Sequence, residues 1–136
     1  MCSAVSPASD TERVSRSGAI LCVDDSENML VICKTILEAG GYTVVTACNG
    51  QAGLAALKLY AIDLAVVDNR MPGMTGVALA QEIKQTYNNL PVLMFSDSDD
   101  PPSARTVDLF LNKRSGPRAL CDAVGMLLAR SREGAP

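Results

Sequence analysis

Short apolar or β-rich runs alternate with amphipathic helical patterns along most of this chain of 136 residues. Five such runs cover residues 19–23, 42–47, 64–67, 91–95 and 107–111. Because they are short and largely continuous, they are typical of strands buried on both faces of a sheet. Strands that alternate with helices in this way predict an α/β domain with a five-stranded parallel sheet covered by helices on both faces.

Amphipathic segments between the runs predict the helices, because apolar residues recur there at helical spacing. They are expected to open near Ser26, Asn49, Gly76 and Ser115. In the first of them Ser26 can cap an apolar stripe from Met29 to Leu37, and Gly40-Gly41 is expected to end it. In the last of them Pro117 stands in the first turn, where proline is tolerated.

The connection between the last two strands is too short for an ordinary helix. Only sixteen residues separate Ser96 from Lys113, and Pro101-Pro102 interrupts them. A proline pair breaks a helix, and a helix with both connections hardly fits this length. We therefore expect the fourth helix to be short, distorted or missing, with a rearranged or mobile segment at about 97–106.

The two ends of the chain are polar and lack apolar periodicity. Residues 1–17 are predicted to be a flexible leader, residues 18–131 the folded domain, and residues 132–136 a frayed tail. The leader has no apolar core of a secretory signal, and no run approaches the length of a membrane span. The five cysteines include no C-x-x-C pair. We expect a cytoplasmic protein without membrane insertion.

Composition excludes several classes of function. The chain has no histidine, which removes Ser-His-Asp and Cys-His catalysis and histidine-liganded zinc. It has no tryptophan, three tyrosines and two phenylalanines, so stacking platforms for single-stranded nucleic acid are not expected. The net charge is −3, without a basic stripe, so direct binding of nucleic acid is not expected either.

Polar residues follow the predicted strands at their carboxyl ends, which meet at the functional edge of such a sheet. They are Asp24, Asp25, Asp68, Ser96 and Lys113. Taken singly, each has an ordinary explanation as a helix cap, a turn residue or a surface lysine. Together, three carboxylates at one edge favour a shared Mg²⁺ or Mn²⁺, and the lysine suits a phosphate-like anion.

The sequence resembles the receiver domain of two-component response regulators over about residues 19 to 130. The runs that carry the resemblance are ILCVDDSE (20–27), DLAVVDNRMPGMTG (63–76), PVLMFS (91–96) and FLNK (110–113). The resemblance implies a flavodoxin-like (βα)₅ doubly wound fold. It also implies a place in a His-Asp phosphorelay, in which residues 18–131 form the receiver domain and a partner supplies the histidine.

The resemblance further implies a role for each candidate residue. Asp68 would accept a phosphoryl group from a phosphohistidine on a histidine kinase or a phosphotransfer protein. Asp24 and Asp25 would hold Mg²⁺ together with Asp68 and the backbone carbonyl of Arg70. The remaining implied residues are Ser96 and Lys113, which would contact the phosphoryl group, and Phe110, the switch aromatic.

Two positions depart from the family pattern beside these residues. Arg114 follows Lys113 where the family usually has proline, so a cis peptide bond is not expected at that joint. Asp97 follows Ser96 where the family favours a small residue. This carboxylate could alter the lifetime of a phosphoaspartate, or it could simply point into solvent.

Three functions remain open on the sequence. The first is a phosphorylatable receiver that signals by contact with a downstream protein. About 20 residues follow Lys113, which predicts a stand-alone receiver without a catalytic output domain. Its own chemistry would be limited to self-phosphorylation from phosphohistidine and autodephosphorylation. The second function is a docking module of the same fold that works without phosphorylation. The third is a flavodoxin-like binder or hydrolase of small molecules, which the lack of a Gly-rich phosphate loop disfavours.

Overall fold

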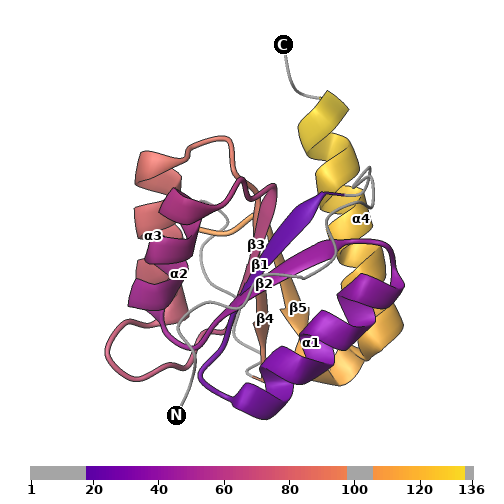
Figure 1. Cartoon of the computed structure of the whole chain (residues 1–136), viewed down its shortest axis with the longest axis horizontal. Helices are drawn as coiled ribbons and strands as arrows, with labels where there is room; N and C mark the ends of the chain where they lie inside the picture. Colours follow the sequence, from indigo (N-terminus) through magenta and orange to yellow (C-terminus); the bar gives the residue numbers. More distant parts are fainter. Residues whose placement is uncertain (1–17, 98–105, 134–136) are drawn as a thin grey trace.

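The computed structural model describes residues 18–97 and 106–133, which form one α/β sandwich (Figure 1). Its strands are β1 Ala19–Val23, β2 Thr43–Ala47, β3 Leu64–Val67, β4 Val92–Ser96 and β5 Leu109–Asn112. Its α-helices are α1 Glu27–Ala39, α2 Gly50–Leu59, α3 Gly76–Thr86 and α4 Pro117–Glu133. A short 3-10 helix, η1, covers Lys113–Ser115. The prediction of an α/β fold with five strands is confirmed.

The five strands form one parallel sheet in the order β2-β1-β3-β4-β5. Val23 at the end of β1 pairs with Ala47 of β2 and with Val67 of β3. Ser96 at the end of β4 pairs with Asn112 at the end of β5. The residues that follow these ends therefore meet at the carboxyl edge of the sheet.

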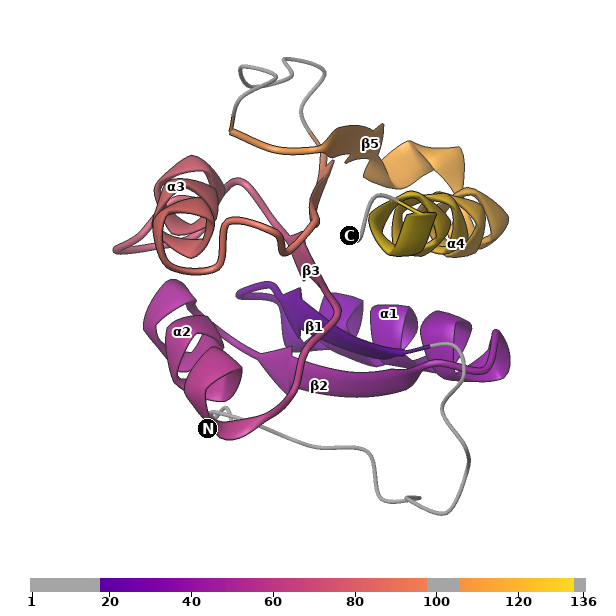
Figure 2. The ribbon, with the colours of Figure 1, turned by 90° about the horizontal axis from the view of Figure 1, so that it is seen from above.

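Two helices cover each face of the sheet, with α2 and α3 on one side and α1 and α4 on the other (Figure 2). Alternate strand residues enter two separate apolar cores because side chains of a strand point to opposite faces. Leu21, Ala65 and Met94 enter the core beneath α2 and α3. Ile20, Val66 and Leu93 enter the core beneath α1 and α4. These strands are buried on both faces, as their apolar runs predict.

Capping residues fix where the first three helices begin. Ser26 accepts a hydrogen bond from the Met29 backbone, which confirms its predicted role at the start of α1. Asn49 caps α2 by accepting a hydrogen bond from Ala52 N, and Thr75 caps α3 by accepting one from Ala78 N. Each cap satisfies one of the backbone donors that a helix leaves open at its start.

Some predicted features fall on parts of the chain that the structure leaves out. The leader, residues 1–17, lies outside the described residues, as do residues 134–136 of the predicted tail. Residues 98–105 of the segment predicted to be rearranged also lie outside them. Within the described ranges no helix lies between β4 and β5, so four α-helices accompany the five strands. None of the helices among these residues is both long and apolar enough to cross a membrane.

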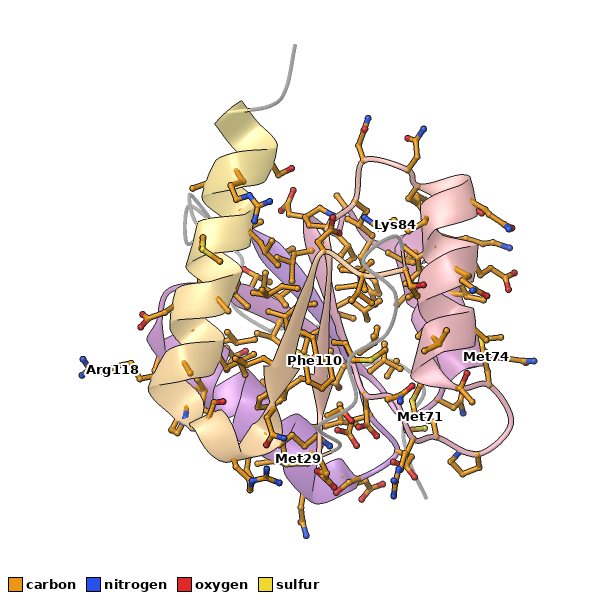
Figure 3. All side chains as sticks on the ribbon, turned by 180° about the vertical axis from the view of Figure 1, so that it is seen from behind. Met29, Met71, Met74, Lys84, Phe110 and Arg118 are labelled. Atoms are coloured by element: carbon orange, nitrogen blue, oxygen red, sulfur yellow. The ribbon has the colours of Figure 1, made fainter. Side chains whose placement is uncertain are left out.

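A lysine and an aspartate join three elements at the amino ends of β4 and β5. Lys84 of α3 donates hydrogen bonds to the Leu90 carbonyl, 3.0 Å away, and to the carboxylate of Asp108. The same carboxylate accepts from Val92 N at 2.8 Å, and Asp108 N donates to the Val92 carbonyl. Lys84 lies at the opposite end of the sheet from Met29 and Met71 (Figure 3). We call Lys84, Asp108 and their backbone partners the amino-end cluster.

Candidate functional site

Two aspartates follow β1 at the carboxyl edge of the sheet. Asp24 is only 5% exposed, whereas Asp25 is exposed. Asp24 N donates to the Ala47 carbonyl, which continues the β1–β2 ladder by one residue. Its carboxylate accepts a hydrogen bond of 2.9 Å from Ser26 N, which fixes the side chain at the start of α1.

Asp68 follows β3, the strand next to β1. Its backbone N–H donates to the Val23 carbonyl at 2.9 Å, so Asp68 stands beside Asp24 at the sheet edge. The residue is 6% exposed. The neighbouring order of β1 and β3 thus brings together carboxylates that are far apart in the sequence.

Asp24, Asp25 and Asp68 form a cluster of oxygen donors. Each offers one carboxylate oxygen, and these three oxygens lie within 4.8 Å of one another. Carboxylate oxygens are the ligands that Mg²⁺ prefers in proteins, and no sulfur or imidazole ligand competes in this set. The residues present therefore fit a magnesium ion, as the sequence predicts.

Lys113 faces two of these carboxylates from the end of β5. Its Nζ lies 2.9 Å from Asp24 Oδ2 and 3.1 Å from Asp68 Oδ1. The following turn, η1, is capped by Asn112, whose side chain accepts a hydrogen bond from Arg114 N. Proline at position 114 would have no such donor. The described residues contain no cis peptide bond, so the Lys113–Arg114 bond is trans, as expected.

The charges of these groups change one another's protonation. Burial, and then the neighbouring charge of Asp24, raise the pKa of Asp68 to about 6, although Lys113 opposes this shift. Burial lowers the pKa of Lys113, but the hydrogen bond and charge of Asp24 and then of Asp68 outweigh it and raise that pKa above its usual value. A second cation beside Asp68 would favour its ionised form.

A cavity of about 360 Å³ opens over these groups. It is lined by Asp24, Asp25, Ser26, Met29, Asp68, Arg70, Ser96, Asp97 and Lys113. Ser96, the last residue of β4, is 1% exposed. It lines the cavity from the strand that neighbours β3 on the side away from β1. The structure thus brings together Asp24, Asp25, Asp68, Ser96 and Lys113, and Arg70 borders the same space.

Phe110 stands apart from the cavity and is not among its lining residues. It is half-buried on β5, pairs with Met94, and packs against the core beneath α2 and α3 (Figure 3). Its role as a switch stays a prediction.

Two cavity residues, Ser26 and Met29, have no role in the site that the sequence predicts. The sequence predicts Met29 on the apolar face of α1 and Ser26 as the cap of that helix, yet both residues also line the cavity. The signal that indicates this is their position: Ser26 directly follows Asp25, and Met29 lies in the first turn of α1, which starts at the sheet edge. Asp97 also lines the cavity and is exposed, so whether its carboxylate acts on the site stays a prediction.

Gly76 lets the first turn of α3 approach the backbone of Asp68 closely. Gly76 N donates to the Asn69 carbonyl at 2.8 Å. A Cβ atom at position 76 would lie 2.2 Å from the Asp68 carbonyl oxygen, a distance that no real contact allows. The start of α3 is therefore seated directly against the peptide that carries the Asp68 side chain.

Comparison with known families gives one match that covers most of the chain. The family model of the response regulator receiver domain matches residues 20–125. These residues include every side chain at the carboxyl edge described above.

Individual relatives agree with this match. The probable transcriptional regulator ycf27 of Cyanidium caldarium is 32% identical over 120 residues, which are 85% of this chain and 48% of that relative. The chain spans about half the length, or less, of the first curated relatives that it matches.

Solved structures share the fold. A CheY-like response regulator receiver domain protein from Methanospirillum hungatei is 25% identical, with a TM-score of 0.81 over 87% of this chain and 98% of its own. The response regulator protein TrrA from Thermotoga maritima, solved in complex with Mg(2+)-BeF, is 27% identical, with a TM-score of 0.76 over 81% of this chain and 98% of its own.

Proposed function

Because this chain belongs to the response regulator receiver domain family of two-component systems, we propose that Asp68 accepts a phosphoryl group from a phosphohistidine on a partner protein. The observation that carries the proposal is the placement of Asp68 within reach of two acidic neighbours and of Lys113. The 136 residues contain no histidine, so the proposed donor histidine lies outside them. A histidine kinase or a histidine phosphotransfer protein is the proposed partner.

Asp24, Asp25, Asp68 and the backbone carbonyl of Arg70 are the proposed ligands of Mg²⁺, with Mn²⁺ as a possible substitute. Bound there, the divalent cation would supply charge neutralisation for the oxygens of the transferred group. The three carboxylates support this assignment by their mutual distances.

In the proposed reaction a carboxylate oxygen of Asp68 attacks the phosphorus atom. A new O–P bond forms, the P–N bond to the donor imidazole breaks, and its electron pair stays on that nitrogen. Phosphoryl transfer depends mainly on positioning and on neutralisation of charge, so a general base is not needed. A carboxylate nucleophile is an established route to an acyl phosphate.

Lys113 and Ser96 are proposed to bind the phosphoryl group once it is on Asp68. Lys113 is held between Asp24 and Asp68, and an added anion would draw its ammonium group away from Asp24. The Ser96 hydroxyl borders the cavity at the end of β4, where it can donate to a phosphoryl oxygen.

The output of the proposed reaction is a changed protein surface. New charge on Asp68 would draw Ser96 inward and shift the chain after β4, and Phe110 on β5 is the proposed aromatic switch. We propose that a downstream protein, rather than nucleic acid, binds that surface, and that the reaction takes place in the cytoplasm.

Covalent labelling tests the proposal. The full chain is incubated with Mg²⁺ and either phosphoramidate or acetyl phosphate, and its intact mass is measured. We expect one added phosphoryl group on the wild type and none on Asp68→Asn. The matched control Asp122→Asn, which changes an exposed aspartate of α4, should be labelled like the wild type.

Equal labelling of the wild type and Asp68→Asn would overturn the assignment of Asp68. No labelling of the wild type by either donor would instead favour the docking module that works without phosphorylation.

A further inference from the structure

Two cysteines of the apolar core have no part in the proposed chemistry. Cys22 lies on β1 and Cys33 on α1, and both belong to the core beneath α1 and α4. Both thiols are free, and the two residues are only 1% and 3% exposed. The Cys22 thiol donates a hydrogen bond to the Cys33 sulfur, so the two side chains are in direct contact.

The cysteine pair lies directly behind the carboxylates of the cavity. Only Val23 separates Cys22 from Asp24, and the Asp24 carboxylate accepts a hydrogen bond from Ser26 N at the start of α1. Cys33 lies about two turns further along the same helix. A covalent bond between the two sulfur atoms would therefore close a loop of the chain that contains the proposed metal ligands Asp24 and Asp25.

We propose that Cys22 and Cys33 are a site of reversible oxidation, and that a disulfide bond between them lowers the rate at which Asp68 accepts a phosphoryl group. The oxidant is a peroxide, and the reductant that reverses the change is a dithiol. This inference rests on the proposed function, because the disulfide acts on the proposed site of phosphoryl transfer.

Access to the pair depends on movement of α1. Strand β1 is hydrogen-bonded to β2 on one side and to β3 on the other, which holds Cys22 in place. Helix α1 lies on the surface of the sheet, where side-chain packing by residues such as Leu30 and Leu37 holds it (Figure 2). Local opening of such a helix costs less than opening a central strand. Oxidation therefore begins at Cys33.

The reaction consumes one peroxide for each disulfide bond. With hydrogen peroxide, the Cys33 sulfur attacks one oxygen, the O–O bond breaks, and a sulfenic acid forms as water leaves. The Cys22 sulfur then attacks the oxidised sulfur, the S–O bond breaks, and a second water leaves. The two thiols lose two hydrogens and two electrons in total, and the peroxide gains them.

The disulfide bond changes the geometry at the carboxyl edge of the sheet. Sulfur atoms in a hydrogen bond lie farther apart than the S–S bond length of about 2.05 Å, so bond formation draws α1 toward β1. Ser26 N moves with the helix, and the Asp24 carboxylate that it holds moves too. Because small displacements of reacting groups slow a reaction strongly, we expect labelling of Asp68 to be about tenfold slower. Mg²⁺ binding should weaken about as much, since Asp24 is a proposed ligand.

The experiment compares the reduced and the peroxide-treated full chain. Peptide mapping after alkylation of the remaining thiols should identify a Cys22–Cys33 disulfide. Labelling by phosphoramidate with Mg²⁺, followed by intact mass, should become about tenfold slower after treatment and should recover in dithiothreitol. Cys33→Ala should keep its own labelling rate after the same treatment, and Cys22→Ala serves as a second variant. The matched control Cys121→Ala removes another free thiol, on α4, and should respond to peroxide like the wild type.

Three results would each overturn the inference. They are the absence of the Cys22–Cys33 disulfide after treatment, a disulfide-bonded protein that is labelled as fast as the reduced one, and an equal loss of rate in treated Cys33→Ala. Titration calorimetry of Mg²⁺ binding separates this inference from the proposed function. If even the reduced wild type is not labelled, the proposed function fails, whereas unchanged Mg²⁺ affinity in the disulfide-bonded chain would contradict the action of the cysteine pair on the site.

Discussion

Each end of the sheet holds a lysine that contacts an aspartate, but the two clusters differ in their balance of negative and positive side chains. In the amino-end cluster one carboxylate, that of Asp108, meets Lys84 and a backbone N–H, and Lys84 also meets a carbonyl. At the carboxyl end Lys113 is shared by Asp24 and Asp68, while Asp25 stands beside them. The carboxyl-end cluster holds three carboxylates and one lysine, whereas the amino-end cluster holds one of each.

The difference indicates which cluster is structural and which is built for an external ion. The amino-end cluster satisfies its charges within the chain and joins α3, β4 and β5. The carboxyl-end cluster keeps three carboxylates close together, which is unfavourable until a further cation neutralises them. The same pair of residue types thus serves stability at one end and, in the proposed function, chemistry at the other.

The largest expected effect separates the two lysines by their role in phosphorylation. Lys113→Met should slow labelling of Asp68 about a hundredfold, because it removes a charge that stabilises the transferred phosphoryl group. Lys84→Met should leave the rate within about twofold, since its ammonium lies at the other end of the sheet. Both rates are measured by intact mass at saturating Mg²⁺. Similar losses of labelling rate in the two variants would contradict the different roles assigned to the two lysines.

A smaller effect concerns the stability that the amino-end cluster supplies. Lys84→Met should lower the free energy of unfolding by about 1 to 2 kcal/mol, because Asp108 loses its ion pair and Leu90 its hydrogen-bond donor. Urea unfolding followed by circular dichroism measures this change. Lys58→Met, at an exposed position near the end of α2, is the matched control and should cost little. An equal cost in the two variants would show that the cluster is not structural.

The smallest effect concerns stability in the absence of metal. It arises from the repulsion among the three carboxylates at the carboxyl end of the sheet. Because the pKa of Asp68 is raised to about 6 in the folded protein, the folded state holds this proton more tightly than the unfolded chain does. The resulting stability is present below about pH 4 and is lost as the pH rises through about 6. At about pH 8 in EDTA, Asp68→Asn should therefore be about 1 kcal/mol more stable than the wild type.

Urea unfolding at two pH values checks this expectation. The advantage of Asp68→Asn should shrink at about pH 5 and should also shrink when Mg²⁺ stabilises the wild type. Asp108→Asn at the other end should be less stable than the wild type at both pH values. A destabilised Asp68→Asn at the higher pH would contradict the difference between the two ends.

The sequence predicts the carboxyl-end arrangement well because its cause is periodic. Buried strands leave apolar runs, and the polar residue after each run must lie at one edge of a parallel sheet. Asp24, Asp68 and Ser96 could be located in this way without any contact being known. The contacts themselves could not: Lys113 and Asp24 are 89 positions apart, and their distance of 2.9 Å depends on the folded strand order.

The amino-end cluster has no sequence signal of this kind. Lys84 and Asp108 are 24 positions apart and belong to no periodic pattern. Their pairing also explains a difference in a strand boundary: the sequence predicts a strand at 107–111, whereas β5 is Leu109–Asn112. The Asp108 carboxylate accepts a hydrogen bond from Val92 N. This backbone donor is therefore bonded to a side chain rather than to a carbonyl of β5, and the ladder between β4 and β5 starts later.

The close approach of Gly76 to Asp68 has a consequence for how this chain tolerates random substitution. In a library selected only for folding, the charged positions of the cavity would accept many residues, since neutral side chains relieve the repulsion there. Position 76 would stay glycine, because any Cβ collides with the Asp68 carbonyl. The most restricted position near Asp68 would thus be an uncharged residue that takes no part in the proposed chemistry.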